Sequence, residues 1–241
     1  AQGYRIFTFD NRGTPPSDTP PGPYSIEMFA DDTIGLMEAL KLSDCRLWGL
    51  SVGGLVCQEV TRRRPDLVKG AICHAGFGRT SAFGKLSAQA MIDLMATGVT
   101  VPESLALLFG LKDSLRPRAL HDDRAVEEAL DFLRSMRTSW DQGLAWQLAA
   151  TVQWAKRDHD EELSTIRRPV LVLAAEHDAS FPPSQLERYA ALLPDGEYAQ
   201  LDDANHVPLY GIKSLVRRCV EFFARLDAPP VTSSDADKGP S

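Results

Sequence analysis

The sequence lacks three features that would each point to a class of protein. It has no uninterrupted apolar run near the roughly 20 residues that a membrane-spanning helix needs, and its first residues show no signal-peptide pattern. It also has no basic patch, because 33 acidic and 26 basic residues leave a net charge of −7 that is spread along the chain. We therefore predict neither a membrane nor a nucleic acid among its partners.

Cysteine is also scarce. The chain has four, far apart and each inside an apolar run, and they form no C-x-x-C motif and no Cys/His cluster: Cys45, Cys57, Cys73 and Cys219. This pattern predicts buried free thiols, with no disulfide and no metal site, and it favours a reducing cytoplasm. Nothing in the sequence implies a cofactor.

What the chain does contain is an alternation of short apolar runs with helical patterns. Its 241 residues suit one large α/β domain. The alternation predicts a mostly parallel sheet with helices on both faces. We expect the strands at residues 4–9, 45–50, 69–73, 169–174 and 197–201.

Several helices carry clear boundary signals. Ser25 can cap a helix over residues 26–40, with Tyr24 packed on Phe29 as a hydrophobic staple. A second helix is expected over 52–64, where Pro65 ends it. We also expect a helix that starts with a capping box at Ser184, a last helix over 209–226, and a disordered tail over 228–241.

The alternation is interrupted between residues 77 and 168, which hold helical patterns but no convincing strand. Two of these patterns cover 125–136 and 142–155. We therefore predict a helical insertion over 77–168, between two parts of a core formed by 1–76 and 169–227.

Residues 49–54 read GLSVGG and place Ser51 where a strand-like run becomes a helix-like one. A serine hydroxyl needs a base, a group that orients the base, and donors for the oxyanion. A sharp turn from strand to helix lifts the hydroxyl clear and puts the next N–H at a helix N-terminus. Small residues must flank such a turn, and Gly49, Gly53 and Gly54 do so. The alternative is a tight turn that merely carries a serine.

An acid and a histidine follow in chain order. Asp178 stands just past the expected strand 169–174, at the edge where open α/β sheets build their sites. Glu176 is the competing acid, but it lies closer to the strand. His206 follows the strand expected at 197–201, and we predict that it is the general base.

The other histidines fit less well. His121 and His159 lie among charges in the insertion and are expected to be solvated, while His177 precedes the acid. His74 ends an expected strand and is the rival base. We interpret it as a support for the triad or as part of the substrate pocket wall.

Four stretches together resemble the α/β-hydrolase family, in particular its capped esterase, lactonase and cofactor-free haloperoxidase-like branch. They read GYRIFTFDNRGTPPSD, GLSVGG, PVLVLAAEHDASFPP and LDDANHVP. The resemblance implies that Ser51 is the nucleophile, Asp178 the acid and His206 the base, with the Val52 N–H as an oxyanion donor. It also implies that the insertion is a lid over the site.

Two departures from the family pattern stand out. The family loop D-x-R-G-x-G-x-S keeps Asp10, Arg12, Gly13 and Ser17 here, but Pro15 replaces its second glycine. The upstream strands and the loop that supplies a second oxyanion donor have no match in this chain. We expect that the natural protein is longer and that its N-terminal strands are missing here.

The insertion holds three of the four tryptophans, which we take as candidate substrate contacts although lid packing is the simpler alternative: Trp140, Trp146 and Trp154. We predict a serine hydrolase that acts on a medium-sized, mostly apolar ester, thioester or lactone as its small-molecule partner. The same triad could serve acyl transfer, perhydrolysis, lyase or cyclisation chemistry. A non-catalytic receptor is a further alternative. The sequence leaves the oligomeric state open, and a homodimer is compatible with it.

Overall fold

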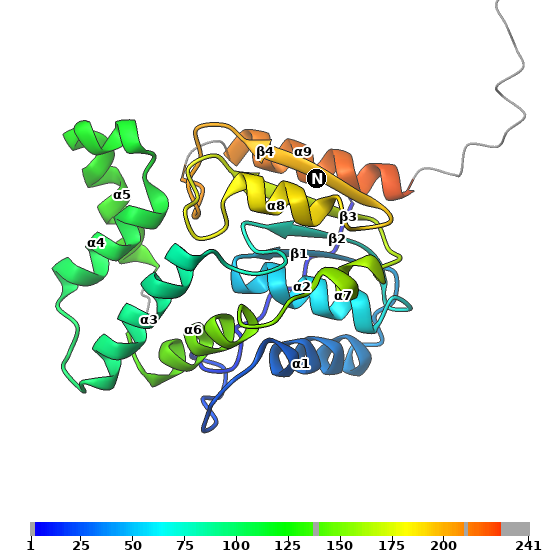
Figure 1. Ribbon diagram of the computed structural model, residues 1–241, viewed down its shortest axis with the longest axis horizontal. Coiled ribbons are helices and arrows are strands. Elements are labelled where there is room, and N and C mark those ends of the chain that lie inside the picture. The colour runs from blue at the N-terminus through cyan, green and yellow to red at the C-terminus, as the bar shows by residue number, and fades with distance from the viewer. Residues whose placement is uncertain (1–2, 137–139, 210–211, 228–241) are drawn as a thin grey trace, which may run out of the picture.

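A computed structural model describes residues 3–136, 140–209 and 212–227. Its sheet has four parallel strands in the order β1-β2-β3-β4 (Figure 1). The strands are β1 (Cys45–Leu50), β2 (Val68–His74), β3 (Val170–Ala175) and β4 (Gly196–Leu201). The predicted parallel sheet is therefore confirmed, and four of the five expected strands lie within one residue of their predicted ends.

Helices cover both faces of this sheet, and successive strand residues point to opposite faces. On one face Cys73, Val170 and Val172 join a core with α1 (Ile26–Ala39), α2 (Val52–Arg63) and α8 (Pro183–Ala190). On the other face Ile72 and Leu171 pack against α9 (Ile212–Asp227). Figure 1 shows α9 and α1 on opposite sides of the sheet. Two buried faces explain the unbroken apolar run of β3.

The segment between β2 and β3 is helical, and its described residues contain no strand. Most of it stands to one side of the sheet in Figure 1. Its elements are α3 (Ala82–Ala96), α4 (Glu103–Ser114), the 3-10 helix η1 (Pro117–His121), α5 (Asp123–Ser135), α6 (Gln142–Trp154) and α7 (Asp160–Ser164). We call this helical segment the insertion; its limits at 77 and 168 stay a prediction. None of the helices in the described ranges could cross a membrane, because none is both long and apolar enough.

The first helix begins as its sequence predicts. The Ser25 hydroxyl accepts a hydrogen bond from Met28 N at 3.2 Å. Tyr24 packs edge-on against Phe29, with ring centroids 5.9 Å apart. The cap supplies an acceptor to one of the four N–H groups that a helix start leaves unpaired.

Three predictions are wrong. Residues 4–9 are not a strand, because no described strand lies beside them to complete a ladder, and Ile6 is 81% exposed. Helix α8 begins at Pro183 and has no side-chain cap, so Ser184 does not form a capping box. His159 is buried rather than solvated, because its two ring nitrogens pair with Glu162 and with the Trp154 carbonyl. The expected tail over 228–241 and the start of the last helix at 209–211 fall wholly or partly outside the described residues.

Candidate active site

Ser51 lies on the sharp turn between β1 and α2. Its backbone has a φ of 56° and a ψ of −118°, in the region that residues with a side chain rarely adopt. Its N–H donates to the His74 carbonyl at 2.9 Å, which ties the turn to the end of β2. Strained backbone of this kind clusters at functional sites and persists only where the surroundings enforce it.

The surroundings that enforce the turn are bare backbone. A Cβ atom on Gly54 would lie 3.0 Å from the Gly76 carbonyl carbon and closer still to its oxygen. A Cβ atom on Gly76 would collide with the Ser51 carbonyl, and one on Gly49 with the Gly53 carbonyl. Gly53 differs, because a Cβ atom there would meet nothing within 4 Å. The turn therefore requires glycine at 49, 54 and 76, while the expected need for a small residue at 53 finds no support.

Three side chains from distant parts of the chain form one hydrogen-bonded row. His206 Nε2 lies 2.9 Å from Ser51 Oγ, and His206 Nδ1 lies 2.7 Å from Asp178 Oδ2. Since the three belong to the ends of β1, β3 and β4, the parallel sheet brings them to the same edge. This row has the hydrogen-bonded order of a nucleophile, a base and an acid.

Asp178 is held so that only one oxygen faces His206. Its Oδ1 accepts from Ser180 N at 2.8 Å and Phe181 N at 2.9 Å, and the residue is 2% exposed. The Phe181 ring stacks on the His206 imidazole, with centroids 5.9 Å apart. Glu176, the competing acid, accepts instead from Asp203 N at 2.6 Å. The local hydrogen bonds thus favour Asp178 as the carboxylate that orients the imidazole.

Opposing effects set the charges in this row. Burial alone lowers the pKa of His206, but the charge of Asp178 and its hydrogen bond outweigh burial and raise it. Burial raises the pKa of Asp178, but the charge and hydrogen bond of His206 and two backbone N–H groups lower it overall. The pair is therefore arranged to favour a carboxylate beside a basic imidazole.

Val52 is the first residue of α2, directly after Ser51. The first four N–H groups of a helix have no acceptor within it, and they carry the positive end of the helix dipole. The Val52 N–H therefore faces no competing intrahelical carbonyl. This is the position in which the resemblance expects an oxyanion donor.

His74 ends β2 and is fully buried. Neither ring nitrogen has a hydrogen-bond partner among the described residues. Its pKa is lowered to about 4, mainly by burial and also by the charge of His206, while the charge of Asp178 partly opposes this. His74 is therefore neutral at pH 7. Its expected contact with substrate stays a prediction.

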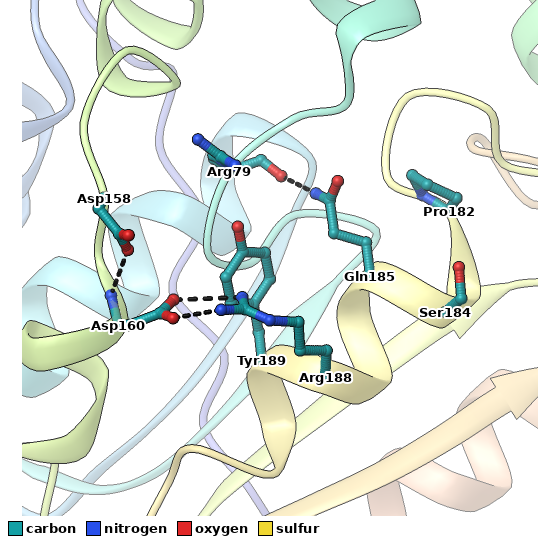
Figure 2. A pocket seen from close by; sticks show the side chains of 8 residues that line it. All are labelled: Arg79, Asp158, Asp160, Pro182, Ser184, Gln185, Arg188 and Tyr189. Carbon is teal, nitrogen blue, oxygen red and sulfur yellow. Dashed lines mark hydrogen bonds and ion pairs between the residues drawn. The ribbon is translucent and has the colours of Figure 1, made fainter.

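Two cavities stand out in the described part of the protein. One of about 480 Å³ lies among α3, α4, α5 and α6 and reaches Val207, the neighbour of His206. Trp140 lines it, with its ring centroid 5.6 Å from that of Phe109. The other, of about 380 Å³, lies by α8 and is lined by charged groups such as Arg188, which pairs with Asp160 (Figure 2). None of the three residues of the hydrogen-bonded row lines either cavity, but the first cavity reaches Val207, next to His206.

The other two tryptophans make packing contacts. Trp154 is 3% exposed, donates from Nε1 to the Gly78 carbonyl at 2.8 Å and stacks on His159 at 4.1 Å. Trp146 packs edge-on against Tyr24, with centroids 5.2 Å apart. Neither lines the two cavities. Their expected substrate contact finds no support in this geometry.

The insertion also contacts the loop after residues 4–9. Gln147 Nε2 donates to the Arg12 carbonyl at 2.9 Å and to Thr14 Oγ1 at 2.7 Å. Arg12 itself makes a two-pronged ion pair with Asp32 on α1.

Within the described ranges, no group of three or more His, Cys, Asp and Glu side chains is placed to hold a metal ion.

Comparison with known proteins places the chain in a family. The family model of the alpha/beta hydrolase fold matches residues 1–211. BpoC of Mycobacterium tuberculosis, named as a candidate non-heme bromoperoxidase, is 29% identical over 229 residues, which are 95% of this chain and 86% of BpoC. Its crystal structure has a TM-score of 0.84 at 28% identity, covering 92% of this chain and 81% of that one.

Two further relatives carry hydrolase names. RutD of Agrobacterium fabrum, named as a candidate carbamate hydrolase, is 27% identical over 205 residues, 84% of this chain and 76% of RutD. The structure of a thermophilic esterase from Thermogutta terrifontis has a TM-score of 0.73 at 25% identity, covering 91% of this chain and 79% of that one. The parallel sheet covered by helices agrees with these matches. The chain belongs to the α/β-hydrolase fold family of enzymes.

Proposed function

We propose that this protein is a serine hydrolase that cleaves an ester, thioester or lactone through an acyl-enzyme. The observation that carries the proposal is the unbroken row Ser51–His206–Asp178, with hydrogen bonds of 2.9 and 2.7 Å. A binding protein has no need of this row. The depressed pKa of Asp178 and the raised pKa of His206 suit the roles of acid and base.

In the proposed mechanism Ser51 Oγ attacks the carbonyl carbon while His206 Nε2 takes its proton. The carbonyl oxygen becomes an oxyanion, which the Val52 N–H stabilises. As the tetrahedral intermediate collapses, His206 gives the proton to the leaving group. His206 then takes a proton from water as the water oxygen attacks the acyl carbon. The bond between that carbon and Ser51 Oγ breaks, the carboxylic acid leaves, and His206 returns the proton to Ser51 Oγ. Asp178 stays ionised throughout and holds the imidazole in one tautomer.

The cavity of about 480 Å³ favours an apolar acyl group of moderate size. Its wall is largely aliphatic and aromatic, with Leu107, Phe109 and Leu148 among its members. Trp140 would contact the substrate there. The esterase and hydrolase names of the relatives are in line with this substrate class.

A second use of the same site is perhydrolysis, because one relative is named as a candidate non-heme bromoperoxidase. Hydrogen peroxide would then replace water, attack the acyl-enzyme and release a peracid, with the peroxide proton passing through His206 to Ser51. The two reactions differ only in the molecule that takes the acyl group, which is water or hydrogen peroxide. The same row of Ser51, His206 and Asp178 could therefore serve both.

Labelling with a fluorophosphonate probe and hydrolysis of p-nitrophenyl esters of increasing chain length test the proposal. We expect one label on Ser51 and hydrolysis that stops in Ser51→Ala. The matched control is Ser164→Ala, since Ser164 is an exposed serine on α7. Full turnover by Ser51→Ala, or no label on Ser51 in the wild type, refutes the proposal. Product analysis with added peroxide separates hydrolysis from perhydrolysis.

A further inference from the structure

His206 stands in a loop, residues 202–209, that is tied to the insertion by hydrogen bonds to backbone carbonyl groups. We call it the His206 loop. Val207 N donates to the Asp113 carbonyl at 2.8 Å. On the other flank, Asn205 Nδ2 donates to the Lys112 carbonyl at 2.8 Å and to the Leu115 carbonyl at 2.7 Å. Both neighbours of His206 are thus bonded to the same short stretch of the insertion.

That stretch is the C-terminal end of α4, and its position explains why it binds the loop. The last four carbonyl groups of an α-helix have no partner within the helix. Lys112 and Asp113 belong to this last turn, and Leu115 follows it as the C-cap. The His206 loop supplies the missing donors. It therefore caps α4, and in return α4 fixes the loop.

Asn205 is the central residue of this arrangement. It is 7% exposed, and its two amide hydrogens both reach carbonyls of the insertion. Its Oδ1 accepts from His206 N at 2.8 Å. One side chain thus bonds the backbone of His206 and the end of α4 together. No other residue type of this size carries two donors and an acceptor in one plane.

We propose that Asn205 is a positioning residue that ties His206 to the last turn of α4. The inference rests on the proposed role of His206 as general base. Asp113 and Ser114 of α4 also line the 480 Å³ cavity, together with Val207. A group that fills this cavity therefore rests against the same backbone that holds the base. Through Asn205, the cavity wall and His206 move as one body.

Fluorophosphonate labelling tests this because it separates two quantities. The final label per chain counts the molecules with a reactive Ser51, and the rate constant measures how well the base activates each one. For Asn205→Ala we expect near-complete final labelling with a rate constant about 10- to 100-fold lower, because misplacing a catalytic group by about 1 Å costs on that order. In ester hydrolysis, kcat falls by a similar factor while KM changes little.

Two variants sharpen the test. Asn205→Asp keeps an oxygen that can accept from His206 N but removes both donors to α4, and we expect it to be slow as well. Asp203→Asn is the matched control: Asp203 lies in the same loop and pairs with Arg116 and Arg118, but its side chain bonds nothing in α4. We expect its rate constant to stay within twofold of wild type.

Three other outcomes would overturn the inference. Low final labelling with an unchanged rate per site makes Asn205 a folding residue only. A wild-type rate in Asn205→Asp limits its role to the His206 N–H, and slow labelling in Asp203→Asn spreads the effect over the whole loop. If Asn205→Ala does not fold, Asn205→Ser takes its place with the same criteria. A wild type without label on Ser51 refutes the proposed function itself, whereas a labelled wild type matched in rate by Asn205→Ala refutes only this inference.

Discussion

The two adjacent glycines after Ser51 should respond in opposite ways to the same added methyl group. In Gly54→Ala the new Cβ meets Gly76 backbone, 3.0 Å from the carbonyl carbon, 3.2 Å from Cα and nearer still to the oxygen. Gly76 cannot shift freely without moving Ser51, because their backbones lie so close that a Cβ on Gly76 would meet the Ser51 carbonyl. Overpacking of this kind costs about 1–3 kcal/mol in free energy of unfolding. In Gly53→Ala the methyl group meets nothing within 4 Å.

Gly53 lies in the first turn of α2, where alanine restricts the unfolded chain and stabilises a helix by about 0.5–1 kcal/mol relative to glycine. Gly54 lies in the same turn and gains the same benefit, so we expect the two variants to differ by the overpacking cost alone, about 1–3 kcal/mol in the free energy of unfolding. For a chain of this length about 1 kcal/mol moves Tm by about 2–4 °C. Urea denaturation gives the free energies, and thermal scans give Tm. Equal stabilities for the two variants, or a Gly54→Ala protein as stable as wild type, would refute the steric argument.

Three further predictions concern the site. The pKa of His74 is lowered from 6.5 to about 4, so the folded protein loses about 3 kcal/mol in free energy of unfolding as pH falls from 6.5 to 4. Urea titrations at several pH values should show this loss in wild type and not in His74→Leu. Equal losses in both proteins would contradict the prediction. Asp178→Asn should lower kcat by about 10⁴-fold. Because it removes the charge that raises the pKa of His206, the acid limb of the pH–kcat/KM profile should move to lower pH. A limb that stays in place or moves to higher pH would refute the proposed pairing of Asp178 with His206. Trp140→Ala should raise KM for long-chain p-nitrophenyl esters by about tenfold and leave KM for p-nitrophenyl acetate unchanged. Equal effects on the two esters would show that Trp140 does not contact the acyl chain.

Features that depend on local sequence were predictable. The apolar runs gave four strands, because a strand buried on both faces must be apolar throughout. Ser25 and Tyr24 marked the first helix through contacts within one turn. The positions of Ser51, Asp178 and His206 just after three of the strands were also predictable, since parallel strands place their carboxyl ends on one edge of the sheet.

Features that depend on distant partners were not predictable. Residues 4–9 have the composition of a strand, but a strand exists only beside another. His159 has charged neighbours in sequence, yet the fold buries it under Trp154. Gly76 and Asn205 went unnoticed for the same reason, because Gly76 meets Ser51 across the sheet and Asn205 bonds a helix about 90 residues away. The only local signal was that each stands within two residues of a candidate site histidine.

The main-chain hydrogen bond that supports the Ser51 turn has a consequence for engineering. The hydrogen bond that anchors the Ser51 turn comes from the carbonyl group of residue 74, which every amino acid possesses. The imidazole on that same residue makes no hydrogen bond with any described residue. Position 74 can therefore be varied to change the polarity around His206 and Asp178 while the anchor of the turn is retained. Substitutions there would alter the stability of the fold in acid without replacing Ser51.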